Sequence, residues 1–423
     1  MTKETWKSLK SIAIVIAVAG ATWLVERRGW FDSLEGAAFD FQHRLAISNL
    51  PELSENIVVV DIDDDSYERC FKNSSPLNPQ SVMELVKNVS GSQDKSGNAS
   101  SKPVVVGVDI LTESLEYASY LNDKKVEAPV IWAVDTLKKT HENEIVYEPR
   151  FVLGRKVAEE VPNAGMGELR WGPPVYPQEG DSHVRRYPRS FVFSRPTSGE
   201  VLSDSYRVRT WARAVSETYR KEKKNGEQQL EGEPEMVFLT HRKRAGWIPA
   251  SAFLKGCSPE SHEHSATARK ETGLGEQISK DAVKDKIVLI GGTFGGKDEH
   301  LSAVDQISGI ALNAAAVKAE LSNDFVREVP RWLFFIGDIA LGFILLLWDH
   351  AYPSKTVRGK FTKVGAVAFI LFCISWKMMD IGLIWLSWSG FLLGMLIVLM
   401  VELNVENPKM NEHEDKHEST PES

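Results

Sequence analysis

Short, continuously apolar runs alternate with amphipathic segments along the first three quarters of this chain. The apolar runs predict strands at residues 56–62, 103–111, 129–134, 190–193 and 286–290. Apolar residues at helical spacing predict helices at residues 79–89, 203–219 and 310–321. Continuous apolar strands separated by helices are typical of parallel sheets covered on both faces. The pattern predicts an α/β domain with a mostly parallel sheet, in which the polar segments 90–101, 221–234 and 258–280 are surface loops.

Four longer apolar runs predict a helical transmembrane region. The expected helices lie at residues 11–26, 331–348, 364–379 and 381–401. A membrane-spanning helix needs about 20 mostly apolar residues. The fourth run meets this length alone, and the others reach it if flanking lysines, glutamates and tryptophans extend to the interface. One helix therefore precedes, and three follow, an extracytoplasmic domain at residues 27–330.

The basic residues predict the orientation of these helices. Lys355, Arg358, Lys360 and Lys363 lie in the loop 349–363, which places it in the cytoplasm. The N-terminus, residues 1–10, and the polar, acid-rich tail, residues 402–423, then also lie there. The tail has the composition of a disordered segment. A cleaved signal peptide is the alternative for the first helix, because three lysines precede it and Ala17-Val-Ala19 resembles a cleavage site. Both interpretations export the domain.

Composition narrows the possible partners. The net charge of −8 without a basic stripe argues against nucleic acid. Of the three cysteines, Cys373 lies in an apolar run and is expected to be a packing residue. Cys70 and Cys257 fall in the exported domain, where they either pair in an oxidising compartment or remain free buried thiols.

Two features of the apolar runs are candidates for function. Asp338 lies about two turns into the second run, where a carboxylate is costly, and Lys377 is its expected partner. The alternative is that Asp338 is protonated or reaches water. Gly390 and Gly394 form a close-packing helix motif in the fourth run, which favours a homodimer.

An acidic motif follows the first predicted strand, at Asp61, Asp63, Asp64 and Asp65. It has three interpretations. The carboxylates could contact a ligand or a cation. Asp61 could be the nucleophile and Asp63 the acid of an exported, metal-dependent phosphohydrolase. The motif could also cap the next helix, with Ser66 or Asp64 as N-cap, and this is the favoured interpretation.

Three other motifs were weighed as sites. The glycine-rich segment 291–298 resembles a phosphate-binding loop, but Asp298 stands where a hydroxyl residue is required, so a tight turn is expected instead. Arg185 and Arg186 could hold an anionic ligand, although a structural ion pair is favoured. His262 and His264 lack further metal-ligating neighbours. No metal, cofactor or catalytic residue is therefore expected.

Taken together, the motifs resemble those of the CHASE2 family of extracytoplasmic sensor domains. The matching segments are Phe39-Asp40 with Arg44, Ile57 to Ser66, Val106 to Leu111 (which contains Asp109), Asp181 with Val184 to Tyr187, Trp247 to Phe253, Lys286 to Asp298, and Gly309 to Ala314. Their order and spacing over most of the chain carry the resemblance. It implies candidate ligand contacts at Asp61, Asp63, Asp64, Asp109, Arg185, Arg186 and Asp298.

The resemblance implies a multi-pass bacterial inner-membrane protein that senses an unidentified stimulus. Relatives of this kind usually continue into a cyclase or kinase, whereas only the tail follows the fourth run here. The expectation is therefore a sensor that is not itself an enzyme and that signals through a separate cytoplasmic or membrane partner. The phosphohydrolase, or a structural component of a membrane complex, is the alternative.

Overall fold

In the computed structural model of the protein, the chain divides into two compact units, Met1–Asn49 with Val326–Ser423, and Leu50–Phe325. The described residues are 12–22, 24, 28, 32–46, 55–91, 102–110, 128–134, 136–141, 144–149, 171–174, 176, 178, 181–194, 205–223, 235–237, 246–254, 257, 281–296, 298–303, 306–352, 356–382, 384–386 and 394–395. The predicted loop at 90–101, the insertion at 258–280 and the tail at 402–423 lie almost wholly or wholly outside them.

A six-stranded parallel sheet forms the centre of the unit Leu50–Phe325. In spatial order its strands are β12 (Trp247–Pro249), β1 (Ile57–Ile62), β13 (Ile287–Gly292), β2 (Val105–Asp109), β3 (Val130–Ala133) and β6 (Trp171–Gly172). Four of them were predicted as buried strands, and all of their apolar residues are buried. The predicted α/β fold with a mostly parallel sheet is confirmed.

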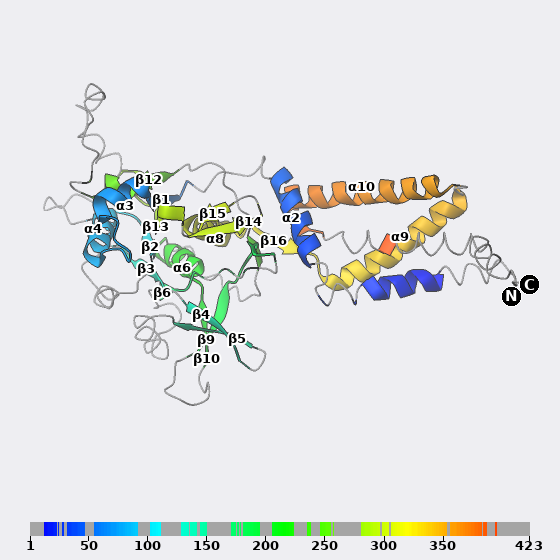
Figure 1. Cartoon of the computed structure of the whole chain (residues 1–423), viewed down its shortest axis with the longest axis horizontal. Coiled ribbons are helices and arrows are strands. Elements are labelled where there is room, and N and C mark those ends of the chain that lie inside the picture. Colours follow the sequence, from blue (N-terminus) through cyan, green and yellow to red (C-terminus); the bar gives the residue numbers. More distant parts are fainter. Residues whose placement is uncertain are drawn as a thin grey trace, which may run out of the picture. The chain divides into compact units, whose positions relative to one another are not determined.

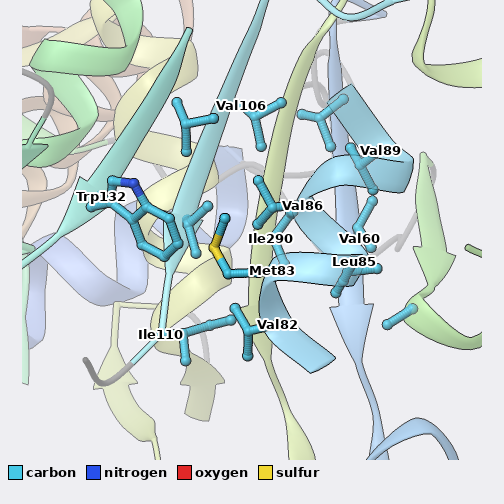
Figure 2. Close-up of a cluster of buried hydrophobic side chains, with 14 of the residues drawn as sticks. Val60, Val82, Met83, Leu85, Val86, Val89, Val106, Ile110, Trp132 and Ile290 are labelled. Atoms are coloured by element: carbon cyan, nitrogen blue, oxygen red, sulfur yellow. The ribbon is translucent and has the colours of Figure 1, made fainter. Parts of the chain in front are cut away.

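One face of this sheet is covered by α4 (Pro79–Ser90), which lies on the opposite side of the strands from α6 (Trp211–Glu222) and α8 (Gly309–Ser322) (Figure 1). Figure 2 shows the apolar contact between α4 and the sheet, where Val82, Met83, Leu85, Val86 and Val89 face strand side chains that include Val60, Val106, Trp132 and Ile290. Because strand side chains alternate between faces, these strand residues all belong to one face. Each fully buried side chain of this kind contributes about 1.5–3 kcal/mol.

The other face packs against α6 and α8 at short range. A side chain on Gly107 would collide with the Trp211 ring of α6, and one on Gly291 would collide with Ile310 of α8. Glycine therefore lets both helices approach the strands. The α8 helix is buried on nearly all sides, including its polar residues Asn313, Lys318 and Glu320.

The segment expected to be a helix at residues 203–219 is only partly helical. It begins as strand β10 (Ser205–Arg209), and α6 starts at Trp211. The alternation of Tyr206 and Val208 with arginines favours a strand over a helix there. β10 belongs to a second, four-stranded sheet with β9 (Ser190–Ser194), β5 (Glu144–Pro149) and β4 (Thr136–His141). Of these, only β9 was predicted.

Shorter elements connect these layers. They are α3 (Asp64–Phe71), β7 (His183–Val184), β8 (Arg186–Tyr187), β11 (Glu235–Val237), η4 (Ala250–Ala252), η5 (Phe294–Gly296), β14 (Glu299–Ser302) and β15 (Gln306–Ser308). β14 pairs with β15 and β7, and β11 pairs with β8. These pairings bring the segment around Asp181 next to the segment that follows β13.

The other unit contains the apolar helices. They include a helix over Ile12–Thr22, α9 (Arg331–Ala351) and α10 (Val357–Gly382), with the amphipathic α2 (Asp32–Ala46). Among the described residues one segment, Phe361–Ile381, is long and apolar enough to cross a membrane, and the other apolar helices are shorter. The remaining predicted spans therefore stay predictions. The α10 helix begins inside the predicted basic loop 349–363.

Contacts inside this unit join α2, which lies at the start of the predicted domain 27–330, to α10, which follows that domain. Gln42 of α2 accepts a hydrogen bond from Ser375 of α10 at 3.0 Å, and Phe41 lies 5.9 Å from Phe372 between ring centroids. The predicted fourth helix, 381–401, differs at its start, where β17 (Ile384–Trp385) pairs with β16 (Phe325–Glu328). Most of its remaining length, with Gly390, lies outside the described residues.

Candidate functional site

Polar residues gather at the carboxyl edge of the central sheet, on the face covered by α8. In strand register Asp61 pairs with Gly291, and Gly291 pairs with Asp109. The two aspartates therefore point to the same face, one on each side of the glycine. Ligands of α/β proteins commonly bind at this edge of a parallel sheet.

The two aspartates of this row cannot share one cation. They are two strand spacings apart, which is about 10 Å, and Ile310 fills the space over the glycine between them. A calcium ion needs its oxygen ligands at about 2.3–2.6 Å. Asp61 is instead engaged by Thr293, whose hydroxyl lies 2.9 and 3.0 Å from the two carboxylate oxygens. The metal-dependent phosphohydrolase, which rests on Asp61 and Asp63, stays a prediction.

The other residues of the acidic motif fix local structure. Asp63 is the N-cap of α3 and accepts a hydrogen bond from the Ser66 amide at 2.8 Å. Asp64 accepts one from the Gly295 amide at 2.8 Å. The capping interpretation is confirmed, but the capping residue is Asp63 and not Asp64 or Ser66. The expectation missed it because any of three adjacent aspartates satisfies the sequence rule.

Asp109 is part of a chain of hydrogen bonds that enters α8. Its Oδ2 accepts from Asn313 Nδ2 at 2.5 Å, and Asn313 Oδ1 accepts from the Tyr176 hydroxyl at 2.5 Å. Only one orientation of the Asn313 amide serves both partners, because a carboxylate accepts and a tyrosine hydroxyl donates. Asn313 is 1% exposed, so this chain connects the sheet edge to the interior of the domain.

Asp298 and His300 lie beside the start of α8. The Gly309 amide donates to the Asp298 carbonyl at 2.8 Å, and a side chain on Gly309 would collide with the Asp298 carboxylate. Negative charge is favourable next to a helix N-terminus. His300 Nε2 lies 3.0 Å from Asp298 Oδ1. Asp61, Asp109, Tyr176, Asp298 and Asn313 together are called the carboxyl-edge cluster below.

The surroundings keep the tyrosines of this region protonated. Burial raises the pKa of Tyr176 well above its usual value, and the negative charges of Asp109 and Asp298 act in the same direction. Burial likewise raises the pKa of Tyr187, as does Glu320. Tyr176 therefore remains a hydrogen-bond donor to Asn313 at every physiological pH.

A set of aromatic and ionic contacts continues from Tyr176 to the end of the domain. The rings of Tyr176 and Tyr187 are 6.1 Å apart, and Tyr187 stacks on Phe325 at 6.3 Å. The Arg189 guanidinium lies 5.0 Å over the Phe325 ring and binds Glu320 of α8 through two hydrogen bonds of 2.9 Å. Phe325 is the first residue of β16.

This second group of residues was not predicted from the sequence. Tyr176, Tyr187, Phe325 and the Arg189–Glu320 pair come from segments up to about 150 residues apart. One signal pointed to part of it, since Asn313, Lys318 and Glu320 interrupt an otherwise apolar and small-residue helix at buried positions. Charged residues are rarely fully buried unless they are paired.

Asp181 and Arg185 form a separate ion pair. Arg185 is 2% exposed and binds both Asp181 oxygens, at 2.9 and 2.7 Å. The Arg185 hydrogen bond, with the His183 amide in support, lowers the pKa of Asp181 to about 2. The favoured interpretation of this motif as a structural ion pair is confirmed for Arg185. Arg186 lies next to it in β8 and remains a candidate ligand contact only by prediction.

The glycine-rich segment forms the expected tight turn. Gly295 and Gly296 have φ angles of 66° and 58°, which favour glycine. Among the described residues no group of three or more histidines, cysteines or acids could hold a metal ion. His262 and His264 lie outside the described residues.

The intramembrane candidates are not brought together. Lys377 forms an ion pair of 2.8 Å with Asp380 and not with Asp338, so the predicted pairing is wrong. The closer acid, one helical turn away, competes better than a residue on another helix. Asp338 borders a hollow lined also by Val15, Ala19, Gly342 and Gly394. Gly342 lets Val15 approach α9 closely, as a small residue does between membrane helices.

Comparison with known proteins identifies the family. The model of the CHASE2 domain matches residues 13–348, which is most of the chain. The chain therefore belongs to the CHASE2 domain family, a family of extracytoplasmic sensory domains. A search of the curated proteins and a search of the solved structures found no match.

Proposed function

We propose that this CHASE2 protein is a membrane-anchored extracytoplasmic sensor that passes its state to a separate partner protein. The observation that supports this most is the continuous set of contacts from the carboxyl-edge cluster to Phe325. That residue begins β16, and only Val329 and Pro330 separate β16 from α9. A change at the sheet edge would reach Phe325 through packed residues, and the chain leads from there into an apolar helix.

The α8 helix is the element that would move in this proposal. Its Asn313 contacts Asp109 and Tyr176 at the sheet edge, and its Glu320 holds Arg189, which packs on Phe325. Because α8 is buried on nearly all sides, it shifts as a rigid unit more readily than it bends. A stimulus acts only through a difference in its affinity for the two positions of α8.

The stimulus would be a hydrogen-bond donor or a cation. Asp109 and Asp298 present carboxylates near the start of α8, and both raise the pKa of Tyr176. A ligand that donates to these carboxylates competes with Asn313 for Asp109. Releasing Asn313 would also release Tyr176, and this is the proposed first step of signalling.

The finer localisation belongs to the same proposal. The protein would lie in the inner membrane of a bacterium as a multi-pass protein, with residues 1–10 and 402–423 in the cytoplasm. Lys360 and Lys363 near the start of α10 support this orientation, because basic residues favour the cytoplasmic side. A partner would bind the segment 352–363 or the tail. The protein itself would carry out no reaction.

Hydrogen exchange of the full chain in lipid nanodiscs tests the coupling. Asn313→Ala removes two hydrogen bonds, each worth about 1 kcal/mol. It is expected to speed exchange of the β16 amides about tenfold. Ser90→Ala is the matched control, since Ser90 is equally buried, bonds to Val86 O at 2.7 Å and lies on α4, on the far face. Unchanged β16 exchange in Asn313→Ala, or an equal change in both variants, contradicts the proposal.

Capture of a partner from native membranes tests the signalling role. Deleting residues 402–423 and replacing Arg358, Lys360 and Lys363 by alanine should abolish capture, while Lys87→Ala in the domain should not. A sensor also predicts that Asn313→Ala changes the amount captured. If Asn313→Ala captures the same amount of partner as the parent chain, a structural component of a complex is favoured. If the partner is still captured after the deletion and the alanine substitutions, the proposed contact surface is wrong.

A further inference from the structure

Two cysteines that are 187 residues apart in sequence meet at one end of the central sheet. Cys70 is in the last turn of α3, and Cys257 follows η4. Both are half-buried and pack against the hydrophobic cluster under α4. The Cys70 thiol is within hydrogen-bonding reach of Cys257.

The elements that precede the two cysteines are held next to each other by other contacts. The Ser251 amide of η4 donates to Ser66 Oγ of α3 at 3.2 Å. Asn88 of α4 donates to the Phe253 carbonyl at 2.8 Å. β12, which leads into η4, pairs with β1, which leads into α3. These contacts bring α3 and the residues that precede Cys257 to the same end of the sheet.

We propose that Cys70 and Cys257 form an intramolecular disulfide that clamps the last turn of α3 to the segment after η4. The proposal rests on the extracytoplasmic placement in the proposed function, because disulfides persist in oxidising compartments. The clamp would act on the candidate site. Tyr67 of α3 stacks on Phe294 of η5 at 4.0 Å, and η5 lies between β13 and Asp298.

The order of the two chemical steps follows from the surroundings of Cys70. Burial, and then the hydrogen bond with Cys257, raise the pKa of Cys70 to about 12. Cys70 is therefore a thiol at neutral pH and a poor attacking group. Once Cys257 is bonded to another sulfur, its contribution to that pKa disappears and Cys70 becomes easier to ionise.

The oxidant is the disulfide of an oxidised dithiol–disulfide oxidoreductase. Cys257 loses its proton and attacks one sulfur of that disulfide, which gives a mixed disulfide and a thiolate on the oxidant. Cys70 then loses its proton and attacks the Cys257 sulfur. One bond forms between Cys70 and Cys257, two protons are released by the protein, and the oxidant leaves as a dithiol that holds the electron pair.

A redox titration of the purified full chain tests whether the two cysteines can form a disulfide, independently of the compartment that holds the domain. The Cys373→Ser background leaves only the two thiols of interest, and mixtures of oxidised and reduced glutathione set the potential. The expected product has lost two hydrogens by intact mass and carries no glutathione. Its unfolding midpoint should fall by about 5–15 °C on reduction, and Cys70→Ser/Cys257→Ser should show no such change. Stable mixed disulfides with glutathione, or unreacted thiols, overturn the proposal.

Alkylation in intact cells tests whether the bond forms where the proposed function puts the domain. Both cysteines should resist alkylation until they are reduced. Lys87→Cys in the Cys70→Ser/Cys257→Ser background reports the compartment, because Lys87 is exposed on α4. Labelling of that residue by an impermeant maleimide, with Cys70 and Cys257 still free in the parent chain, overturns the disulfide and leaves the proposed function standing. Failure of the maleimide to reach it overturns the extracytoplasmic placement, and the disulfide in cells with it.

Discussion

The two faces of the central six-stranded sheet are built in opposite ways. On the α4 face, each strand side chain that contacts the helix is apolar, and the contact is continuous (Figure 2). On the α6 and α8 face the same strands present Asp61, Gly107, Asp109 and Gly291. There the helices approach closely over the glycines, and Asn313 of α8 binds Asp109.

This difference suggests that the α4 face serves stability and that the α8 face serves signalling. An apolar contact has no direction and tolerates no gap, so the α4 face has one favourable arrangement. A chain of hydrogen bonds such as Asp109–Asn313–Tyr176 can exchange a protein partner for a ligand at little net cost. We therefore expect the α8 helix, and not α4, to adopt two positions on the sheet.

The largest loss of unfolding free energy is expected at the buried ion pair of the α8 face. Glu320→Ala leaves Arg189 buried without its carboxylate partner, and breaking a buried ion pair from one side costs about 3–5 kcal/mol. Pulse proteolysis of the full chain in urea measures the loss. Glu222→Ala, at an exposed position of α6, should change stability by less than about 0.5 kcal/mol.

The same pair can be removed from both sides as a check. Arg189→Met with Glu320→Leu leaves no uncompensated charge and should recover most of the stability lost in Glu320→Ala. If the double variant is no more stable than Glu320→Ala, the loss comes from packing around α8 and not from the unpaired arginine.

The apolar face should respond next most strongly. Leu85 of α4 is fully buried, and Leu→Ala at such a position costs about 3 kcal/mol through lost transfer energy and the cavity left behind. Urea unfolding should show this loss while the β16 amides keep their exchange rate relative to global opening. Glu84→Ala, the exposed neighbour, is the matched control. Selective opening of β16 in Leu85→Ala would mean that the α4 face is coupled as well.

A smaller effect is expected from the hydrogen-bonded chain. Asn313→Leu removes the amide that serves Asp109 and Tyr176 and should cost about 2 kcal/mol. Tyr176→Phe removes only the outer bond and should cost about 1 kcal/mol. Both are read by urea unfolding. Equal losses in the two variants would show that the Asn313–Asp109 bond contributes nothing.

The sequence alone predicts the apolar α4 face of the sheet but not the polar contacts of the α8 face. Continuous runs such as Ile57–Val60 and Ile287–Ile290 identify buried parallel strands, because apolar residues on both faces have no other use in a soluble domain. The carboxyl edge also follows, since Asp61 and Asp109 directly end such runs. Strands β4, β5 and β10 of the second, mixed sheet were missed. The two-residue alternation in β10 was included in the helix predicted at residues 203–219.

The partners of each candidate residue could not be derived in the same way. Asp109 meets Asn313, and Arg189 meets Glu320, across more than 130 residues of sequence. Such pairings depend on how α8 packs on the sheet, where Gly291 lets Ile310 approach, and not on any local pattern. The structural ion pair predicted for Arg185 did not name Asp181, although the two residues are only four positions apart.

The smallest predicted effect concerns the ion pair of Asp181 and Arg185, in which only Arg185 is fully buried. The folded domain holds the pKa of Asp181 at about 2, below its ordinary value of 3.8, because Arg185 binds the carboxylate. Because its pKa is lowered in the folded state, ionised Asp181 stabilises the fold above pH 4. The fold loses this contribution as the pH falls toward 2. Since the Asp181 side chain is 23% exposed, solvent screening limits the contribution to about 1 kcal/mol.

Unfolding free energies measured between pH 5 and pH 2 should therefore decline less in Asp181→Asn than in the parent chain, and the variant should already be less stable at pH 5. Asp65→Asn is the control, because Asp65 and Arg69 form an exposed pair at the same spacing, with 56% and 40% of their side chains exposed. An exposed pair contributes about 0.5 kcal/mol or less. Equal pH profiles for the two variants would mean that burying Arg185 adds nothing, and that the polar side of the domain depends only on the contacts of α8.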